Sequence, residues 1–180
     1  GGRYEEACIC CEKAIRIADT IEATGYSVYI NMIHAYALDC LGRYEKAEQV
    51  ILDTARKSDS ILNVRNEHLL AYYLIGQSYH YFSKGDWGLA LDTAEKAVSY
   101  AVRSGRTSYL ARSLLALGNI LAEHDLCDRA QAVACQCLDL CAQQEKYRFY
   151  SISARFLQAQ LLKKQGRRRD FEQAMAALAE

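Results

Sequence analysis

Small and apolar side chains recur along the chain at steps of four and then three residues, which return to one face of an α-helix. Each run begins at an alanine that stands three positions after an aromatic or apolar residue. The runs are Ala7-Cys11-Ala14, Ala47-Ile51-Thr54, Ala90-Ala94-Ala97, Ala130-Ala134-Cys137 and Ala174-Leu178. We call these runs the seams. Their narrow side chains predict five equivalent helices, each closely approached by a neighbouring helix.

A second amphipathic helix lies upstream of each of the later seams, and glycine marks most of the junctions, where it tolerates the backbone of helix ends. The pattern predicts helices near 3–23, 26–41, 44–58, 62–83, 86–104, 107–123, 127–143, 147–165 and 169–179. Absence of proline suits a chain made mostly of helix interior. We therefore expect an all-α protein.

The seams and their turns carry a resemblance to a known family. Gly42-Arg43-Tyr44-Glu45-Lys46-Ala47 and Gly85-Asp86-Trp87-Gly88-Leu89-Ala90 show its order of glycine, aromatic residue and alanine, and small residues follow at plus four and plus seven. This order resembles the tetratricopeptide repeat, here with a period near 42 residues instead of the usual 34. The long period is similar to that of helical sensor domains in bacterial transcription regulators.

The resemblance implies a right-handed superhelical solenoid of antiparallel helix hairpins, with about nine helices in four and a half repeats. It covers residues 1–180 as a single repeat domain, with a half repeat at 1–25 and repeats at 26–60, 61–105, 106–145 and 146–180. Such arrays bury their apolar faces by stacking hairpins on one another. The unpaired first helix and the missing initiator methionine suggest a segment of a longer protein.

In the family, the first helix of each hairpin lines a concave groove that takes a peptide or helix of a partner protein. Transferred to this sequence, the groove positions are Tyr29, Met32, Tyr36, Asp39, Tyr73, Gln77, His80, Arg112, Leu115, Asn119, Glu123, Phe156, Gln160 and Lys163. Tyrosine suits such a surface because it offers a large contact area with a polar tip. Many of the thirteen tyrosines equally suit packing between helices.

We therefore expect a non-catalytic protein-interaction module. The alternative is a ligand- or partner-sensing domain of a multidomain bacterial transcription regulator, which rests on family analogy alone. Lysine plus arginine equals aspartate plus glutamate, so no global field favours nucleic acid. No apolar run approaches the roughly 20 residues that span a bilayer. We expect neither nucleic acid nor membrane as a direct partner.

Eight cysteines cluster inside the expected helices, unlike the loop-based disulfide framework of a small secreted domain, which favours a reducing compartment such as the cytoplasm. Cys11 and Cys137 occupy seam positions, where cysteine acts as a compact apolar side chain. Cys10 and Cys135 are expected to face outward. A metal site and a regulatory disulfide remain alternatives, although no cofactor or metal set is complete. No nucleophile, paired-carboxylate or phosphate-loop motif points to an enzyme.

Two further features are open to more than one interpretation. The run Lys163-Lys164-Gln165-Gly166-Arg167-Arg168-Arg169 fits a solvated helix–turn face, or a site for an acidic peptide or phosphate. The first helix lacks a preceding partner, so Ala7, Cys11 and Ala14 are expected to form an exposed apolar face. That face offers a route to self-association.

Overall fold

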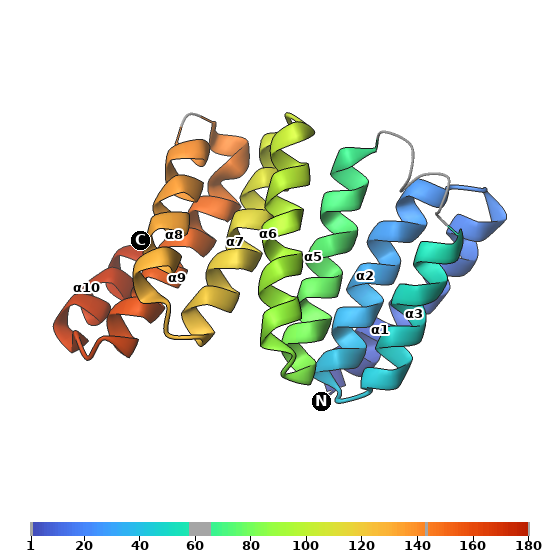
Figure 1. The fold of residues 1–180 in the computed structure, drawn as a ribbon, viewed down its shortest axis with the longest axis horizontal. Coiled ribbons are helices and arrows are strands. Elements are labelled where there is room, and N and C mark those ends of the chain that lie inside the picture. The colour runs from blue at the N-terminus through green and yellow to red at the C-terminus, as the bar shows by residue number, and fades with distance from the viewer. Residues whose placement is uncertain (1, 58–65, 143, 180) are drawn as a thin grey trace. The chain divides into compact units, whose positions relative to one another are not determined.

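The computed structural model describes residues 2–57, 66–142 and 144–179, and this part of the chain contains helices and no strands. The helices fall into two compact units, Gly1–Ser104 and Gly105–Glu180. The division lies within one residue of the predicted junction between the repeats 61–105 and 106–145. The all-α expectation is confirmed (Figure 1).

The described residues of unit 1 form five α-helices, each packed against a neighbouring one. They are α1 (Gly2–Thr20), α2 (Thr24–Cys40), α3 (Tyr44–Lys57), α5 (Glu67–Lys84) and α6 (Trp87–Arg103). Consecutive helices α1 and α2, α2 and α3, and α5 and α6 pack together, and α5 also contacts both α2 and α3. The predicted start of a helix at residue 62 lies outside the described residues.

Unit 2 repeats this pattern of neighbours. Its elements are α7 (Thr107–Glu123), α8 (Cys127–Cys141), a short 3₁₀ helix (Glu145–Tyr147), α9 (Arg148–Lys164) and α10 (Arg168–Ala179). Helix α8 packs on α7 and α9, α10 packs on α9, and α7 contacts α9 directly. In both units, therefore, the first helices of successive hairpins touch each other as well as their own second helices.

The seams are the contact faces of the second helices. Their side chains are fully or almost fully buried in α3, α6 and α8, as the spacing predicts. In α1, by contrast, only Cys11 is buried, whereas Ala7 and Ala14 are half-buried. The expectation of a fully exposed seam on α1 is therefore wrong for Cys11, because that side chain faces α2 together with Cys8 and Ala18.

One turn geometry joins the two helices of the hairpins. After α2, Gly42 adopts a left-handed conformation with φ 70°; its N–H donates to Asp39 O at 2.9 Å, and the N–H of Arg43 donates to Leu38 O at 2.9 Å. These two bonds satisfy carbonyls that the helix end would leave unpaired. The same pair of bonds forms around Gly85, Asp125 and Gly166. The repeat in the sequence is thus also a repeat of backbone geometry.

The core of unit 1 shows why the first helices lie close together. A methyl group added at Gly76 on α5 would lie 2.5 Å from the Sδ of Met32 and 3.0 Å from its Cβ. Glycine is needed there because the Met32 side chain of α2 fills the space. In unit 2, Gly118 of α7 leaves room for Leu157 of α9 in the same way. A methyl group added at Gly118 would lie 2.6 Å from the Cδ2 of Leu157.

Candidate functional site

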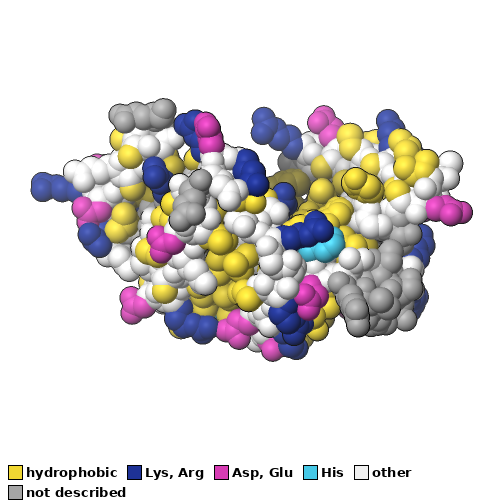
Figure 2. Space-filling view, turned by 90° about the horizontal axis from the view of Figure 1, so that it is seen from above, with side chains coloured by type: hydrophobic (Ala, Val, Ile, Leu, Met, Phe, Trp, Pro, Cys, Tyr) yellow, Lys and Arg dark blue, Asp and Glu magenta, His cyan; other side chains and the backbone are white. Residues whose placement is uncertain are grey.

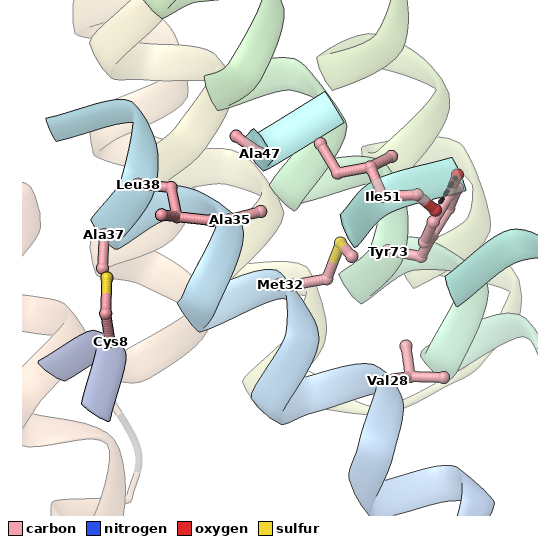
Figure 3. Packing of buried hydrophobic residues seen from close by; sticks show 9 residues of the cluster. All are labelled: Cys8, Val28, Met32, Ala35, Ala37, Leu38, Ala47, Ile51 and Tyr73. Carbon is pink, nitrogen blue, oxygen red and sulfur yellow. Dashed lines mark hydrogen bonds between the residues drawn. The ribbon is translucent and has the colours of Figure 1, made fainter. Parts of the chain in front are cut away.

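Four of the predicted groove residues lie in the interior of unit 1 and not on its surface. They are Met32, Asp39, Tyr73 and His80, all almost completely buried. Figure 3 shows Met32 and Tyr73 among the apolar side chains of the core, with the Tyr73 hydroxyl donating to Ile51 O at 3.4 Å. The expectation that these four side chains contact a partner is therefore corrected: packing between helices covers them.

Asp39 and His80 form a buried polar pair between α2 and α5. His80 Nδ1 donates to Asp39 Oδ1 at 2.9 Å. The side chain of Asp39 is 1% exposed and that of His80 is 4% exposed. Asp39 Oδ2 and His80 Nε2 have no hydrogen-bond partner among the described residues. Each side chain is therefore the other's one hydrogen-bond partner among the described residues, and losing either one would leave a buried polar group unpaired.

Exposed and half-buried aromatic side chains line one face of the first helices α2 and α5, while Tyr4 of α1 and Trp87 of α6 are exposed elsewhere in unit 1. We define the tyrosine face as Tyr26, Tyr29, Ile33 and Tyr36 of α2 with Tyr72 and Tyr79 of α5. The rings of Tyr29 and Tyr72 meet edge to face at 4.8 Å, and those of Tyr36 and Tyr79 at 5.7 Å. Tyr26 is 70% exposed, and Ile33 and Tyr36 are also exposed. Gln77, the remaining predicted position on α5, is half-buried.

The hydroxyl of Tyr36 is held in its protonated form. Partial burial, with a smaller contribution from the neighbouring Cys40 thiol, raises the pKa of Tyr36 to about 12. A tyrosine with the ordinary pKa of about 10 is already protonated at neutral pH, so the shift extends this form of the phenol to more alkaline pH. An aromatic ring with a fixed polar tip is a common anchor in protein interfaces.

In unit 2 an exposed apolar stripe follows helix α9. Phe149, Ile152 and Phe156 recur at steps of three and four residues, and Phe149 is 71% exposed. We call these three residues the α9 stripe. Gln160 and Lys163 continue the same helix face and are exposed. The predicted position Phe156 thus belongs to a larger accessible surface than the sequence transfer named.

The predicted positions on α7 form a polar flank. Arg112, Asn119 and Glu123 are exposed and Leu115 is half-buried. Arg112 already has a partner, since its Nε donates to the Tyr150 hydroxyl at 2.8 Å. Its guanidinium carbon also lies 5.6 Å from the centre of the Tyr150 ring. Arg112 therefore ties α7 to α9 while leaving part of its side chain accessible.

Most of the basic run near α10 is engaged within unit 2. Lys164 Nζ donates to Ala122 O at 2.6 Å, at the end of α7, and lies 3.4 Å from Asp125 Oδ1. Two further ion pairs are Arg167 with Asp170 and Arg168 with Glu172. On the face of the molecule drawn in Figure 2, basic and acidic side chains are interspersed. These contacts favour the solvated-face interpretation of the run over an anion site.

The cysteines divide by burial. Cys8, Cys11, Cys137 and Cys141 are buried thiols, whereas Cys10, Cys40 and Cys135 are exposed, which confirms the outward orientation of Cys10 and Cys135. Burial raises the pKa of Cys137 to about 12, with a further contribution from Cys141. The described residues include no cluster of three histidine, cysteine or acidic side chains that could hold a metal ion.

Among the exposed members of the tyrosine face and the α9 stripe, the sequence transfer did not name Tyr26, Ile33, Phe149 and Ile152. The signal was present, because each stands three or four residues from a predicted position or from another member of its face.

None of the helices in the described ranges is long and apolar enough to cross a bilayer. Comparison with known protein families and with curated proteins finds no match to this sequence.

Proposed function

We propose that this chain is a helical-repeat module of the tetratricopeptide kind that binds a peptide or helix of a partner protein. The observation that carries the proposal is the grouping of exposed and half-buried aromatic side chains along one face of first helices. In unit 1 they form the tyrosine face on α2 and α5, and in unit 2 the α9 stripe. Exposed apolar groups that recur along one helix face typically mark an interaction surface.

Three features support the repeat assignment. The seams of α3, α6 and α8 are buried, the same turn recurs within the hairpins around Gly42, Gly85, Asp125 and Gly166, and first helices contact one another within each unit. In a stacked array this arrangement exposes one face of the first helices to a partner. We propose that the hairpins stack as a superhelix along which both surfaces are accessible.

The chemistry of the two surfaces suggests the kind of ligand. The tyrosine face combines flat rings with hydroxyl donors and has no charged residue among its defining members. It suits an extended or helical segment with apolar anchors and free backbone or side-chain acceptors. The α9 stripe is purely apolar and continues into Gln160 and Lys163. It suits a segment whose apolar residues are followed by an acidic one.

The test uses the whole chain and a displayed peptide library. Peptides that enrich on the wild-type chain are titrated by fluorescence anisotropy against Tyr26→Ala/Tyr36→Ala and Phe149→Ala/Phe156→Ala. At least one double variant should weaken binding more than roughly tenfold, because each lost aromatic anchor costs more than about 1 kcal/mol. Thermal unfolding should change little, since these side chains are exposed.

The control is Leu89→Ala on α6, which removes an exposed apolar side chain that belongs to neither surface. Its affinity should equal that of the wild-type chain. The proposal fails if no peptide enriches above background, or if the control weakens binding as much as the two double variants do.

A further inference from the structure

Helix α1 carries a second apolar stripe on a different face of unit 1. Ala7, Cys10, Ala14, Ile17 and Ile21 recur at steps of three, four, three and four residues, which is the spacing of a helix-pairing seam. Ile17 and Ile21 are 64% and 68% exposed, Cys10 is exposed, and the two alanines are half-buried. Ile21 continues the helical pattern, since its N–H donates to Ile17 O at 3.2 Å. We call these residues the α1 stripe.

The α1 stripe is continuous with an established interface. Cys8, Cys11 and Ala18 of the same helix are buried in the unit 1 core, and α1 packs on α2. The stripe lies along the border of this contact. A helix placed there would therefore extend an existing packed layer, and would touch α1 without displacing α2.

The other seams show what kind of element covers such a stripe. The positions equivalent to Ala7 are completely buried in α3, α6 and α8, and the equivalents of Ala14 are at most 1% exposed. These positions are Ala47, Ala90 and Ala130, followed by Thr54, Ala97 and Cys137. In every case the hairpin's first helix, which runs antiparallel, packs against the seam-bearing helix. The geometry of the chain itself therefore identifies the occupant as an antiparallel α-helix.

We propose that the occupant is α1 of a second copy of this chain. The stripe is graded in size, with the small residues Ala7 and Cys10 at one end and the large residues Ile17 and Ile21 at the other. An antiparallel pair centred on Ala14 sets Ala7 opposite Ile21 and Cys10 opposite Ile17, so the two ends of the stripe are complementary to each other. A two-fold dimer requires this self-complementarity. None of the five residues is charged, so pairing buries no unpaired charge.

This dimer is independent of the proposed peptide binding, because the α1 stripe shares no residue with the tyrosine face or the α9 stripe. A single pair of short helices buries less surface than an obligate dimer, so we expect a reversible, concentration-dependent association. The two faces can then be tested separately on the same protein.

The first experiment measures molar mass by sedimentation velocity over a wide range of concentrations. The wild-type chain of 20.3 kDa should approach twice that mass as its concentration rises. Ile17→Lys should remain monomeric, because it places a charge inside the apolar contact, opposite Cys10 of the other copy. Ile9→Lys is the matched control: it changes the same residue type on the same helix, at an exposed position outside the stripe, and should dimerise like the wild type.

The second experiment tests the register by disulfide formation. In a Cys10→Ser background, Ala14→Cys should give a covalent dimer on mild oxidation, because residue 14 of both copies would lie near the two-fold axis. Arg16→Cys, exposed on another face of α1, should give no more dimer than the background. A monomer at every concentration, a dimer that survives Ile17→Lys, or equal cross-linking through positions 14 and 16 would each overturn the proposal.

Discussion

The buried pair of Asp39 and His80 gives the sharpest test of how unit 1 is built. Asp39→Ala leaves His80 without its hydrogen bond in an apolar core, and His80→Ala does the same to Asp39. Leaving a buried polar group without a partner costs about 1–3 kcal/mol, and about 3–5 kcal/mol when the group is charged. We therefore expect each single variant to lose roughly 3 kcal/mol of unfolding free energy.

The double variant separates the pair from the cavities that the substitutions create. Removing both side chains leaves no stranded polar group, so its cost should fall short of the sum of the single costs by about 1–3 kcal/mol. Urea unfolding followed by the fluorescence of Trp87 measures these values in unit 1, because Trp87 is the one tryptophan of the chain and packs edge to face on Phe82 at 4.9 Å. Small and additive losses, below about 0.5 kcal/mol each, would refute the reasoning, because side chains open to solvent behave in that way.

Three further predictions concern the backbone, a buried histidine and the packing of first helices. Gly85→Ala should lower the free energy of unfolding by about 1 kcal/mol, because φ is 83° there. Gly88→Ala within α6 should raise the free energy of unfolding by up to about 1 kcal/mol. Urea unfolding of the two variants should therefore give changes of opposite sign. Burial lowers the pKa of His34 below its ordinary value of 6.5, so the unfolded chain binds a proton more readily and stability falls as pH drops through 6.5. His34→Leu should flatten that slope in urea midpoints measured between pH 7.5 and 5.5. Gly76→Ala should cost about 1–3 kcal/mol by thermal or urea unfolding, since the new methyl group overlaps the Met32 side chain. The same substitution should cost less in a Met32→Ala background, because the overlapping Sδ and Cγ are then absent.

The helices and their buried seams were predictable because they depend on local spacing. Ala47, Ala90 and Ala130 stand at positions where a small residue recurs every three or four places, and all three are completely buried. The turns were equally predictable from the sequence, since glycine marks most of them. Asp125, which adopts φ 56° in place of glycine, keeps the same bonds and shows that the geometry is a property of the turn and not of one residue type.

The candidate surface was less predictable because its members depend on rotation of each helix about its axis. Asp39 and His80 are polar, which suggests exposure, but they pair across 41 residues of sequence and are buried as a result. No local pattern reports such a partner. Tyr36 and Phe156, by contrast, are exposed.

Buried thiols in both units allow local unfolding of each unit to be measured separately. Cys8 and Cys11 lie in unit 1, whereas Cys137 and Cys141 lie in unit 2, and none of the four is accessible in the folded chain. A thiol reagent can modify such a residue only after the surrounding helices separate. The order and rate of labelling therefore report which unit unfolds locally more often. Mass spectrometry of alkylated peptides would therefore read local unfolding rates residue by residue, with no probe introduced into the protein.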